Sequence, residues 1–347
     1  MQRIRASVGD YYYDIHLDNG LTGRLGDRLS ETLHPRRALL IVDENIDRLY
    51  GARVVRSLEA AMIRPYVLTL PTGGYAQTLD ALREITAAMT DMALSPEDAL
   101  VAMGGGKLCD SVGYAAWNYK SVVRLVYVPT TLIGMADWAV GGKTALEYKL
   151  GSRMIGSFFP PTLTLIDPQT VCTMPEREFE SGMAEVIKSA CAADAALFHQ
   201  LETLTGRAAI EVRMEEIAWR CLAIKQSLSG RDRTKLLLGH GMANAIETAQ
   251  RYRGLLHGEA VGVGMRVTAC AAERCGMSAR GTADRIAECL QRYHLPMTAV
   301  VDPDFMLRRI HALGESLDTA VPERVGWCAV RHLGNAFFAD AWFNTPM

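Results

Sequence analysis

Short apolar runs alternate with amphipathic stretches through the first half of the chain, and this alternation restricts the possible folds. Helical patterns such as TLDALREITAAM separate some of these runs. Strands and helices that alternate at this spacing predict a parallel sheet covered by helices. Five apolar runs of strand length end at Gly, Pro or Asp: Arg37–Asp43, Pro65–Pro71, Ala99–Gly106, Arg124–Pro129 and Thr162–Asp167.

The pattern changes after about residue 168, where helical periodicity becomes dominant. It is seen in EREFESGMAEVIKSACAADAALFHQLETL, around residues 210–228, and in HGMANAIETAQRY. A chain of 347 residues is long enough for two cores. We therefore predict a Rossmann-like α/β domain with a parallel sheet over residues 1–168. A mostly α-helical domain is predicted over residues 169–347.

The charge balance argues against nucleic-acid and membrane partners. The formal net charge is -2 and the pI is near 6.5, and no Lys/Arg run forms a basic patch. No apolar stretch reaches the roughly 18 residues of a membrane span, and the N-terminus lacks the apolar segment of a secretory signal. The eight cysteines are scattered without a CxxC pair. These features predict a reduced, cytoplasmic protein.

A glycine-rich turn is the first candidate binding feature. MGGGKLCDSVGYAAW follows a predicted strand and leads into a helix, so its backbone N–H groups could approach a phosphate at the helix N-terminus. The spacing differs from the GxGxxG of an ordinary dinucleotide site. Asp43 ends another strand and could bind a ribose hydroxyl. A tight turn and an Asx turn explain the same residues equally well.

Three residues in the helical half are of the types that bind metals. Glu185 lies in the helical segment GMAEVIK, and His240 and His257 each stand next to a glycine at a predicted helix start. Two neutral imidazoles and one carboxylate would leave an open coordination position on Zn²⁺. A single histidine in apolar surroundings is also commonly a hydrogen-bonded core residue. Spacing alone does not show that the three side chains converge.

A series of motifs resembles the dehydroquinate synthase-like family of sugar phosphate cyclases over roughly residues 35–270. The motifs occur in the family's order: GGGKLCD, VPTTLIGMAD, VGGKT, GSRMIGSFFPP, LIDPQT, GMAEVIK, GHGMANAIE and LHGEAVGVGM. The resemblance implies a two-domain enzyme, usually a homodimer, with NAD and Zn²⁺ or Co²⁺ in the interdomain cleft. It also implies a carbon–oxygen lyase that oxidises a metal-bound hydroxyl transiently and returns the hydride, so that NAD is used without net redox change.

The resemblance also assigns individual residues. It implies that Glu185, His240 and His257 bind the metal. It gives NAD to Asp43 near the adenosine ribose and to Gly104, Gly105, Gly106, Asp110, Thr130, Thr131, Thr173 and Glu178. It places Asp137, Lys143, Lys188, Lys225 and Arg233 among the catalytic residues.

The residues that differ from the family's motifs lie mainly at positions where the family binds its substrate. Asn244 replaces the second histidine of GHxxxH, and an amide cannot shuttle protons at neutral pH. A Lys-Asn pair is replaced by Ser152 and Arg153, whose guanidinium could still bind an anion. Each lost charge-assisted contact is worth about 1.5–3 kcal/mol. Further departures are Ser121, Leu237, Gly74 and Gln77, with Arg308 and Arg309 near the place of two missing lysines.

These departures predict an altered pocket for a polyol or a sugar-phosphate-like substrate, with a role in secondary metabolism. Three alternatives remain open on the sequence. The chain could be an NAD-dependent metal polyol or alcohol dehydrogenase that releases NADH. It could be a working 3-dehydroquinate synthase with compensating changes, or a non-catalytic partner subunit.

Overall fold

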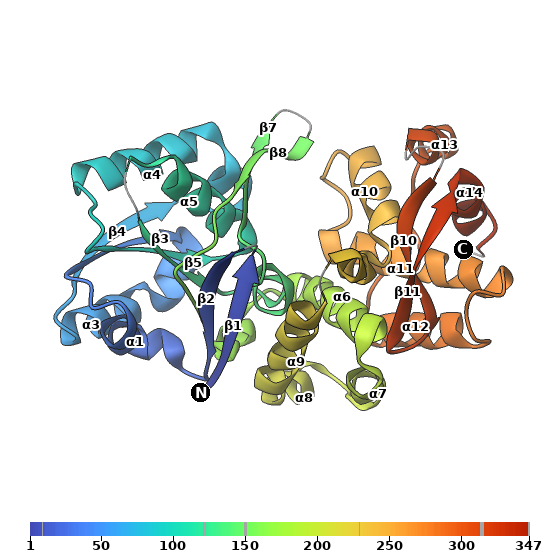
Figure 1. The fold of residues 1–347 in the computed structure, drawn as a ribbon, viewed down its shortest axis with the longest axis horizontal. Coiled ribbons are helices and arrows are strands. Elements are labelled where there is room, and N and C mark those ends of the chain that lie inside the picture. The colour runs from blue at the N-terminus through green and yellow to red at the C-terminus, as the bar shows by residue number, and fades with distance from the viewer. Residues whose placement is uncertain (9, 121–122, 149–150, 229, 313–315, 346–347) are drawn as a thin grey trace. The chain divides into compact units, whose positions relative to one another are not determined.

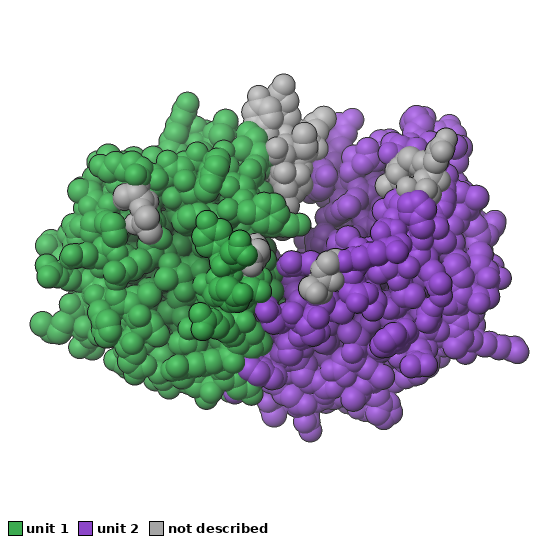
Figure 2. Space-filling view, viewed as in Figure 1, with its two compact units in different colours: residues 1–172 green, residues 173–347 purple. Residues whose placement is uncertain are grey.

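The chain divides into two compact units, Met1–Cys172 and Thr173–Met347 (Figure 2). The computed structural model describes residues 1–8, 10–120, 123–148, 151–228, 230–312 and 316–345. The sequence predicts the boundary at residue 168, and the two units divide a few residues later. None of the helices in these ranges has the length and hydropathy needed to span a membrane.

The first unit is built on a seven-stranded sheet (Figure 1). All neighbouring strands are parallel except β1, which runs antiparallel to β2 at one edge. In spatial order the strands are β1 (Gln2–Val8), β2 (Tyr11–Leu17), β9 (Leu163–Ile166), β6 (Arg124–Pro129), β5 (Ala99–Gly104), β3 (Arg37–Asp43) and β4 (Arg64–Leu70).

Helices cover both faces of this sheet, which explains why its central strands are apolar throughout. Alternate residues of one strand face opposite sides, so Ile41 packs with α4 and α5, and Val42 packs with α1 and α3. Figure 1 shows these two helix layers on opposite sides of the sheet. The helices are α1 (Leu25–Thr32), α2 (Glu44–Ile46), α3 (Ala52–Ala60), α4 (Leu79–Asp91) and α5 (Gly106–Asn118).

The second unit is mostly helical, and the predicted fold class is confirmed for both halves of the chain. Its two longest helices, α6 and α11, are largely buried and form the centre of the core. The helices are α6 (Glu176–Ala193), α7 (Ala195–Thr203), α8 (Arg207–Val212), α9 (Met214–Ser227), α10 (His240–Ala249), α11 (His257–Arg274), α12 (Thr282–Arg292), α13 (Pro303–Ala312) and α14 (Asn335–Phe343).

Two antiparallel hairpins were not predicted as strands. One is β7 (Lys143–Tyr148) with β8 (Gly151–Phe158) in the first unit, and the other is β10 (Ser316–Arg324) with β11 (Trp327–Gly334) in the second. The second hairpin contains Pro322 at a register shift and turns at Gly326, which has a φ of 80°. Pro322 interrupts the regular alternation by which the first strand would be recognised in the sequence.

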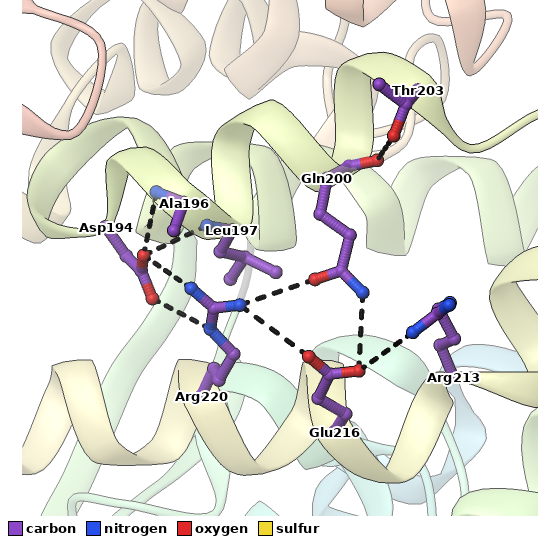
Figure 3. A network of polar contacts seen from close by, with 8 residues as sticks. All are labelled: Asp194, Ala196, Leu197, Gln200, Thr203, Arg213, Glu216 and Arg220. Atoms are coloured by element: carbon purple, nitrogen blue, oxygen red, sulfur yellow. Dashed lines mark hydrogen bonds and ion pairs between the residues drawn. The ribbon is translucent and has the colours of Figure 1, made fainter.

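Asp194 separates α6 from α7, although the periodicity around it continues without a break (Figure 3). Its Oδ1 accepts hydrogen bonds from the backbone N–H groups of Ala196 (3.1 Å) and Leu197 (2.9 Å), which caps α7. The carboxylate also binds the guanidinium of Arg220 on α9 at 2.9 and 2.6 Å. Burial alone raises the pKa of Asp194, but Arg220 and the two amides lower it below its usual value. The cap therefore ties α7 to α9.

Candidate metal and cofactor site

A close contact between α6 and α11 positions two of the candidate metal ligands. Gly258, the second residue of α11, donates its backbone N–H to Ser181 Oγ on α6 at 3.1 Å. A Cβ at Gly258 would lie 1.7 Å from the backbone oxygen of Ser181, so only glycine permits this approach. His257 precedes Gly258, and Glu185 lies one turn after Ser181. The contact therefore brings these two side chains together.

A second glycine contact positions the remaining candidate ligand. Gly239 is the N-cap of α10 and has a left-handed φ of 80°. A Cβ at Gly239 would lie 2.5 Å from the backbone nitrogen of Met265, and a Cβ at Gly264 would lie 2.1 Å from the backbone oxygen of Gly239. The start of α10 is thus packed against the backbone of α11. His240, the next residue, faces the same place as His257.

The side chains of Glu185, His240 and His257 converge, and their candidate donor atoms lie within 4.8 Å of one another. Glu185 Oε1 is 3.9 Å from His240 Nε2 and 3.5 Å from His257 Nε2. This oxygen is buried and, within the described residues, has no hydrogen-bond partner. A buried acceptor without a partner is costly, and a cation between the three groups would satisfy it. The donor set fits Zn²⁺ or Co²⁺ with an open position.

Lys188 holds the other oxygen of Glu185. Its Nζ lies 2.5 Å from Glu185 Oε2, one helical turn along α6, and both side chains are buried. Burial alone raises the pKa of Glu185, but the ammonium of Lys188 and the two imidazoles outweigh it and hold the pKa well below its usual range. Glu185 therefore stays ionised, with one oxygen bound by Lys188 and the other facing the imidazoles.

Each imidazole also has an acceptor near Nδ1. His240 Nδ1 is 3.4 Å from the backbone oxygen of Leu238, and His257 Nδ1 is 3.2 Å from Glu247 Oε1. Burial alone lowers the pKa of His257, but the carboxylates of Glu185 and Glu247 outweigh it and raise the pKa to about 10. Glu247 was not singled out in the sequence. Its position seven residues after His240 is the one available signal, because two helical turns return to the same face.

In the first unit, the three consecutive glycines form the turn between β5 and α5. A Cβ at Gly105 would lie 3.3 Å from Thr131 Cγ2, and the turn accepts a hydrogen bond at Gly104 O from the backbone of Thr130 at 3.0 Å. Thr130 Oγ1 is buried and has no hydrogen-bond partner within the described residues. The structure thus brings Gly104, Gly105, Gly106 and the two threonines together. Backbone N–H groups at the start of a helix such as α5 suit an anion such as a pyrophosphate.

Trp138 lies against this turn and was not singled out in the sequence. Its Nε1 donates a hydrogen bond to Asp110 Oδ1 at 2.8 Å, and its ring is 3.5 Å from where a Cβ at Gly106 would be. The indole packs edge-on against Tyr127 at a centroid distance of 4.6 Å. Trp138 therefore links the glycine turn to Asp110. The adjacent Asp137 is half-buried on the short helical turn Gly134–Trp138.

Asp43 has a clear local role. Its Oδ1 accepts hydrogen bonds from the backbone N–H groups of Asn45 (2.9 Å) and Ile46 (3.0 Å), as in an Asx turn. Val42 pairs with Met103, so Asp43 and Gly104 end neighbouring strands at the same edge of the sheet. Contact of Asp43 with a ribose stays a prediction. The edge is the one at which ligands bind in open parallel sheets.

The other predicted residues lie at the surface or partly buried. Lys143 is exposed at the start of β7, and Lys225 is half-buried near the end of α9. Asn244 is exposed on α10, one turn after His240. Ser121 and the side chain of Arg153 lie outside the residues that the structure describes. Thr173, Glu178 and Arg233 are exposed in the second unit.

Comparisons with known proteins cover both units. Family profiles described as 3-dehydroquinate synthase N-terminal and C-terminal match residues 67–181 and 182–312. The chain is 32% identical over 302 residues to a 3-dehydroquinate synthase from Enterococcus faecalis, covering 85% of this chain and 84% of that protein. It is 39% identical over 272 residues to one from Gloeobacter violaceus, covering 76% and 75% of the two chains.

Solved structures have the same fold. ValA, the 2-epi-5-epi-valiolone synthase from Streptomyces hygroscopicus subsp. jinggangensis 5008 solved with NAD⁺ and Zn²⁺, matches with a TM-score of 0.84 at 25% identity over 98% of both chains. A 2-deoxy-scyllo-inosose synthase matches with a TM-score of 0.86 at 18% identity, covering 98% of this chain and 99% of that one, and at this identity it shows the fold alone.

Together, the profiles and relatives confirm the predicted family and its class of enzyme, a carbon–oxygen lyase of the cyclase type. Both profiles are matched in chain order, and the second contains Glu185, His240 and His257. The chain belongs to the 3-dehydroquinate synthase family.

Proposed function

We propose that this protein is an NAD- and metal-dependent sugar phosphate cyclase with an altered substrate pocket. The observation that carries the proposal is the buried oxygen Glu185 Oε1, which faces the Nε2 atoms of His240 and His257. Such a group suits a catalytic divalent cation with an open position. ValA, solved with NAD⁺ and Zn²⁺, supports the choice of both cofactors.

Some residues of the chain would hold the metal ion, and others would bind NAD. When bound, Zn²⁺ or Co²⁺ polarises a substrate hydroxyl, and NAD accepts a hydride and returns it. Lys188 keeps Glu185 ionised and fixed. The backbone N–H groups at Gly105 and Gly106 would bind the pyrophosphate. The other proposed NAD contacts are Asp43, Asp110, Thr130, Thr131, Thr173 and Glu178.

The substrate is proposed to be a polyol or a sugar-phosphate-like molecule from secondary metabolism. We place Asp137, Lys143, Lys225 and Arg233 among its binding and catalytic groups. Asn244 would hydrogen-bond the substrate, because an amide cannot exchange protons at neutral pH. Three departures change how the pocket would bind an anion: a guanidinium is gained at Arg153, and cationic groups of the family pattern are lost at Ser121 and Ser152.

A second candidate is a working 3-dehydroquinate synthase. Identities of 32% and 39% to proteins with that name favour it. In this case Arg153 and other groups would replace the anion contacts that differ from the family pattern. The acidic heptulosonate phosphate would then still be turned over.

The deciding experiment incubates the purified protein with NAD, Zn²⁺ or Co²⁺, and a panel of sugar phosphates and unphosphorylated cyclitols. We expect phosphate release and a carbocyclic product by mass spectrometry, without accumulation of NADH. Formation of 3-dehydroquinate would instead establish the second candidate. Steady NADH accumulation with a polyol would identify a dehydrogenase. Protein that binds neither metal nor NAD would contradict the proposal and favour a non-catalytic subunit.

We also propose that the protein is a homodimer in the cytoplasm. All eight cysteines are free thiols, which supports a reducing compartment. Light scattering during size-exclusion chromatography should give twice the chain mass of 38.1 kDa. A monomer at micromolar concentration would contradict the dimer.

A further inference from the structure

We infer that Glu247 is a positioning residue that fixes the imidazole of His257 for metal binding. Glu247 lies on α10 and His257 begins α11, so the contact joins two helices across the loop between them. The inference rests on the metal site proposed above and assigns a role to a side chain outside the three candidate ligands.

The imidazole of His257 lies between two carboxylates, one at each ring nitrogen. Its Nδ1 is 3.2 Å from Glu247 Oε1, and its Nε2 is 3.5 Å from Glu185 Oε1. Glu185 is buried, and Glu247 is only 13% exposed. Both carboxylates are thus largely shielded from water, although 39% of the His257 side chain is exposed. Hydrogen bonds to charged acceptors are stronger where water is excluded from the acceptor.

The contact with Glu247 suits the tautomer of the ring that metal binding requires. A neutral imidazole carries one N–H donor and one lone pair, and an ionised carboxylate can only accept. Both ring nitrogens face a carboxylate, at 3.2 Å for Nδ1 and 3.5 Å for Nε2, so the tautomer depends on the metal. A cation held by Glu185, His240 and His257 would take the lone pair of Nε2, and the one remaining hydrogen would then stand on Nδ1, where Glu247 accepts it. An outer N–H that donates a hydrogen bond to a carboxylate also raises the basicity of the inner nitrogen.

The imidazole of His240 also has an acceptor near its Nδ1, but this acceptor is a backbone oxygen. Its Nδ1 faces the backbone oxygen of Leu238 at 3.4 Å, so its acceptor comes from its own chain segment and carries no charge. The His257 ring has a carboxylate instead. We therefore expect His257 to depend more strongly on its outer partner than His240 does.

Glu247 would also favour metal binding through its negative charge. Lys188 balances the charge of Glu185 at a distance of 2.5 Å. The Glu247 carboxylate then adds negative charge beside the ring, which favours a divalent cation on the other side of it. Helix α10 thus supplies His240 at its start and, two turns later on the same face, the group that orients His257.

The test compares Glu247→Ala and Glu247→Gln with the wild type by chelator competition for Zn²⁺ on the full chain. The Ala variant should raise the Kd for Zn²⁺ by about 10- to 100-fold, the range for lost outer partners of metal ligands. The Gln variant keeps an oxygen acceptor without the charge and should show a smaller increase. The visible absorption of bound Co²⁺ should change in the Ala variant, because the His257 ring is no longer fixed.

A control and a fold measurement separate this role from a structural one. Glu288 is an exposed glutamate on α12, and Glu288→Ala should leave Zn²⁺ and Co²⁺ binding unchanged. Thermal unfolding without metal tests whether each variant is folded. If Glu247→Ala does not fold, the nearly isosteric Glu247→Gln variant decides the question.

The outcomes distinguish this inference from the proposed function. Wild-type Zn²⁺ affinity and an unchanged Co²⁺ spectrum in both Glu247 variants would overturn the inference and leave the metal site intact. A lower Tm without metal, at unchanged Zn²⁺ affinity, would also overturn it, since that is the result of a purely structural role. If the wild type itself binds no Zn²⁺ or Co²⁺, the proposed function fails as well.

Discussion

Single residues without side chains decide where the candidate ligands lie. The Gly258 contact with Ser181 and the left-handed Gly239 set the approach of α11 to α6 and to α10. Each glycine stands directly before or after a histidine of the candidate site. The distances between Glu185, His240 and His257 therefore depend on backbone contacts that no ligand residue makes itself.

Gly258→Ala should destabilise the protein and weaken Zn²⁺ binding. Its Cβ would lie 1.7 Å from the backbone oxygen of Ser181, so α11 must move. We expect a loss of about 1–3 kcal/mol in the free energy of unfolding, measured in urea. Gly241→Ala is the matched control, because it is also the second residue of its helix and its Cβ would meet Phe338 at an ordinary 3.8 Å. Equal stability of both variants would contradict the role of the close contact.

Trp138→Phe should weaken NAD binding in the first unit. The change keeps an aromatic ring beside Gly106 but removes the N–H that Trp138 donates to Asp110 at 2.8 Å. A hydrogen bond to a charged group is worth about 1.5–3 kcal/mol, so we expect a rise of about tenfold in the Kd measured by calorimetry. Trp117→Phe, at an exposed tryptophan on α5, serves as the control. Unchanged NAD affinity in Trp138→Phe would remove this residue from the cofactor site.

At the level of elements, the helices and strands that follow one simple pattern could be predicted, and those set by a single contact could not. Arg37–Asp43 and Arg124–Pro129 were predicted with their observed bounds, because buried apolar runs end there at charged or proline residues. The break at Asp194 was missed, since it depends on a cap and on Arg220 from another helix. The hairpin β10–β11 was missed because Pro322, at a register shift, interrupts the alternation of β10.

Asp194→Ala should loosen the junction between α6 and α7. The change removes the cap of α7 and the partner of Arg220, and we expect a loss of about 1–3 kcal/mol in the free energy of unfolding. The pKa of Asp194 is lowered in the folded chain, so its contribution is present above the pKa of the unfolded state. It is lost as the pH falls through the folded pKa. The stability difference from wild type should therefore shrink in acid, and a constant difference would contradict this.

At the level of the whole molecule, the proposed cofactor and metal residues lie largely in different compact units. The glycine turn belongs to the first unit, and Glu185, His240 and His257 belong to the second. The residue types of the metal ligands could be predicted from the sequence, and their grouping into one site could be predicted from the resemblance to the family. Their distances could not be predicted, because they depend on helix crossings between segments far apart in the chain. Glu247 was missed for the same reason.

Glu185→Ala should abolish Zn²⁺ binding and turnover while leaving NAD binding within a few-fold of wild type. The change removes one of the three candidate donors and leaves the β5–α5 turn intact. Metal analysis after dialysis would measure the loss of Zn²⁺ binding, and calorimetry would measure the affinity for NAD. Full zinc occupancy in the variant would contradict the ligand assignment.

Asn244→His alone should not restore efficient formation of 3-dehydroquinate. The departures from the family pattern are spread over both units, as Ser121 and Ser152 lie in the first and Asn244 in the second. One regained imidazole replaces none of the lost anion contacts. A coupled assay for 3-dehydroquinate would measure the effect, and recovery to the level of a relative such as the Gloeobacter violaceus enzyme would show that the pocket is less altered than proposed.

The ion pair between Lys188 and Glu185 affects how the protein would gain and lose its metal ion. Because an ammonium already compensates the buried carboxylate at 2.5 Å, withdrawing the cation leaves no stranded charge in the interior. Demetallation by a chelator should then be reversible without unfolding, and one ion could be exchanged for another in the intact fold. Newly made chains could likewise fold first and acquire their ion afterwards, from whichever divalent metal the cell supplies.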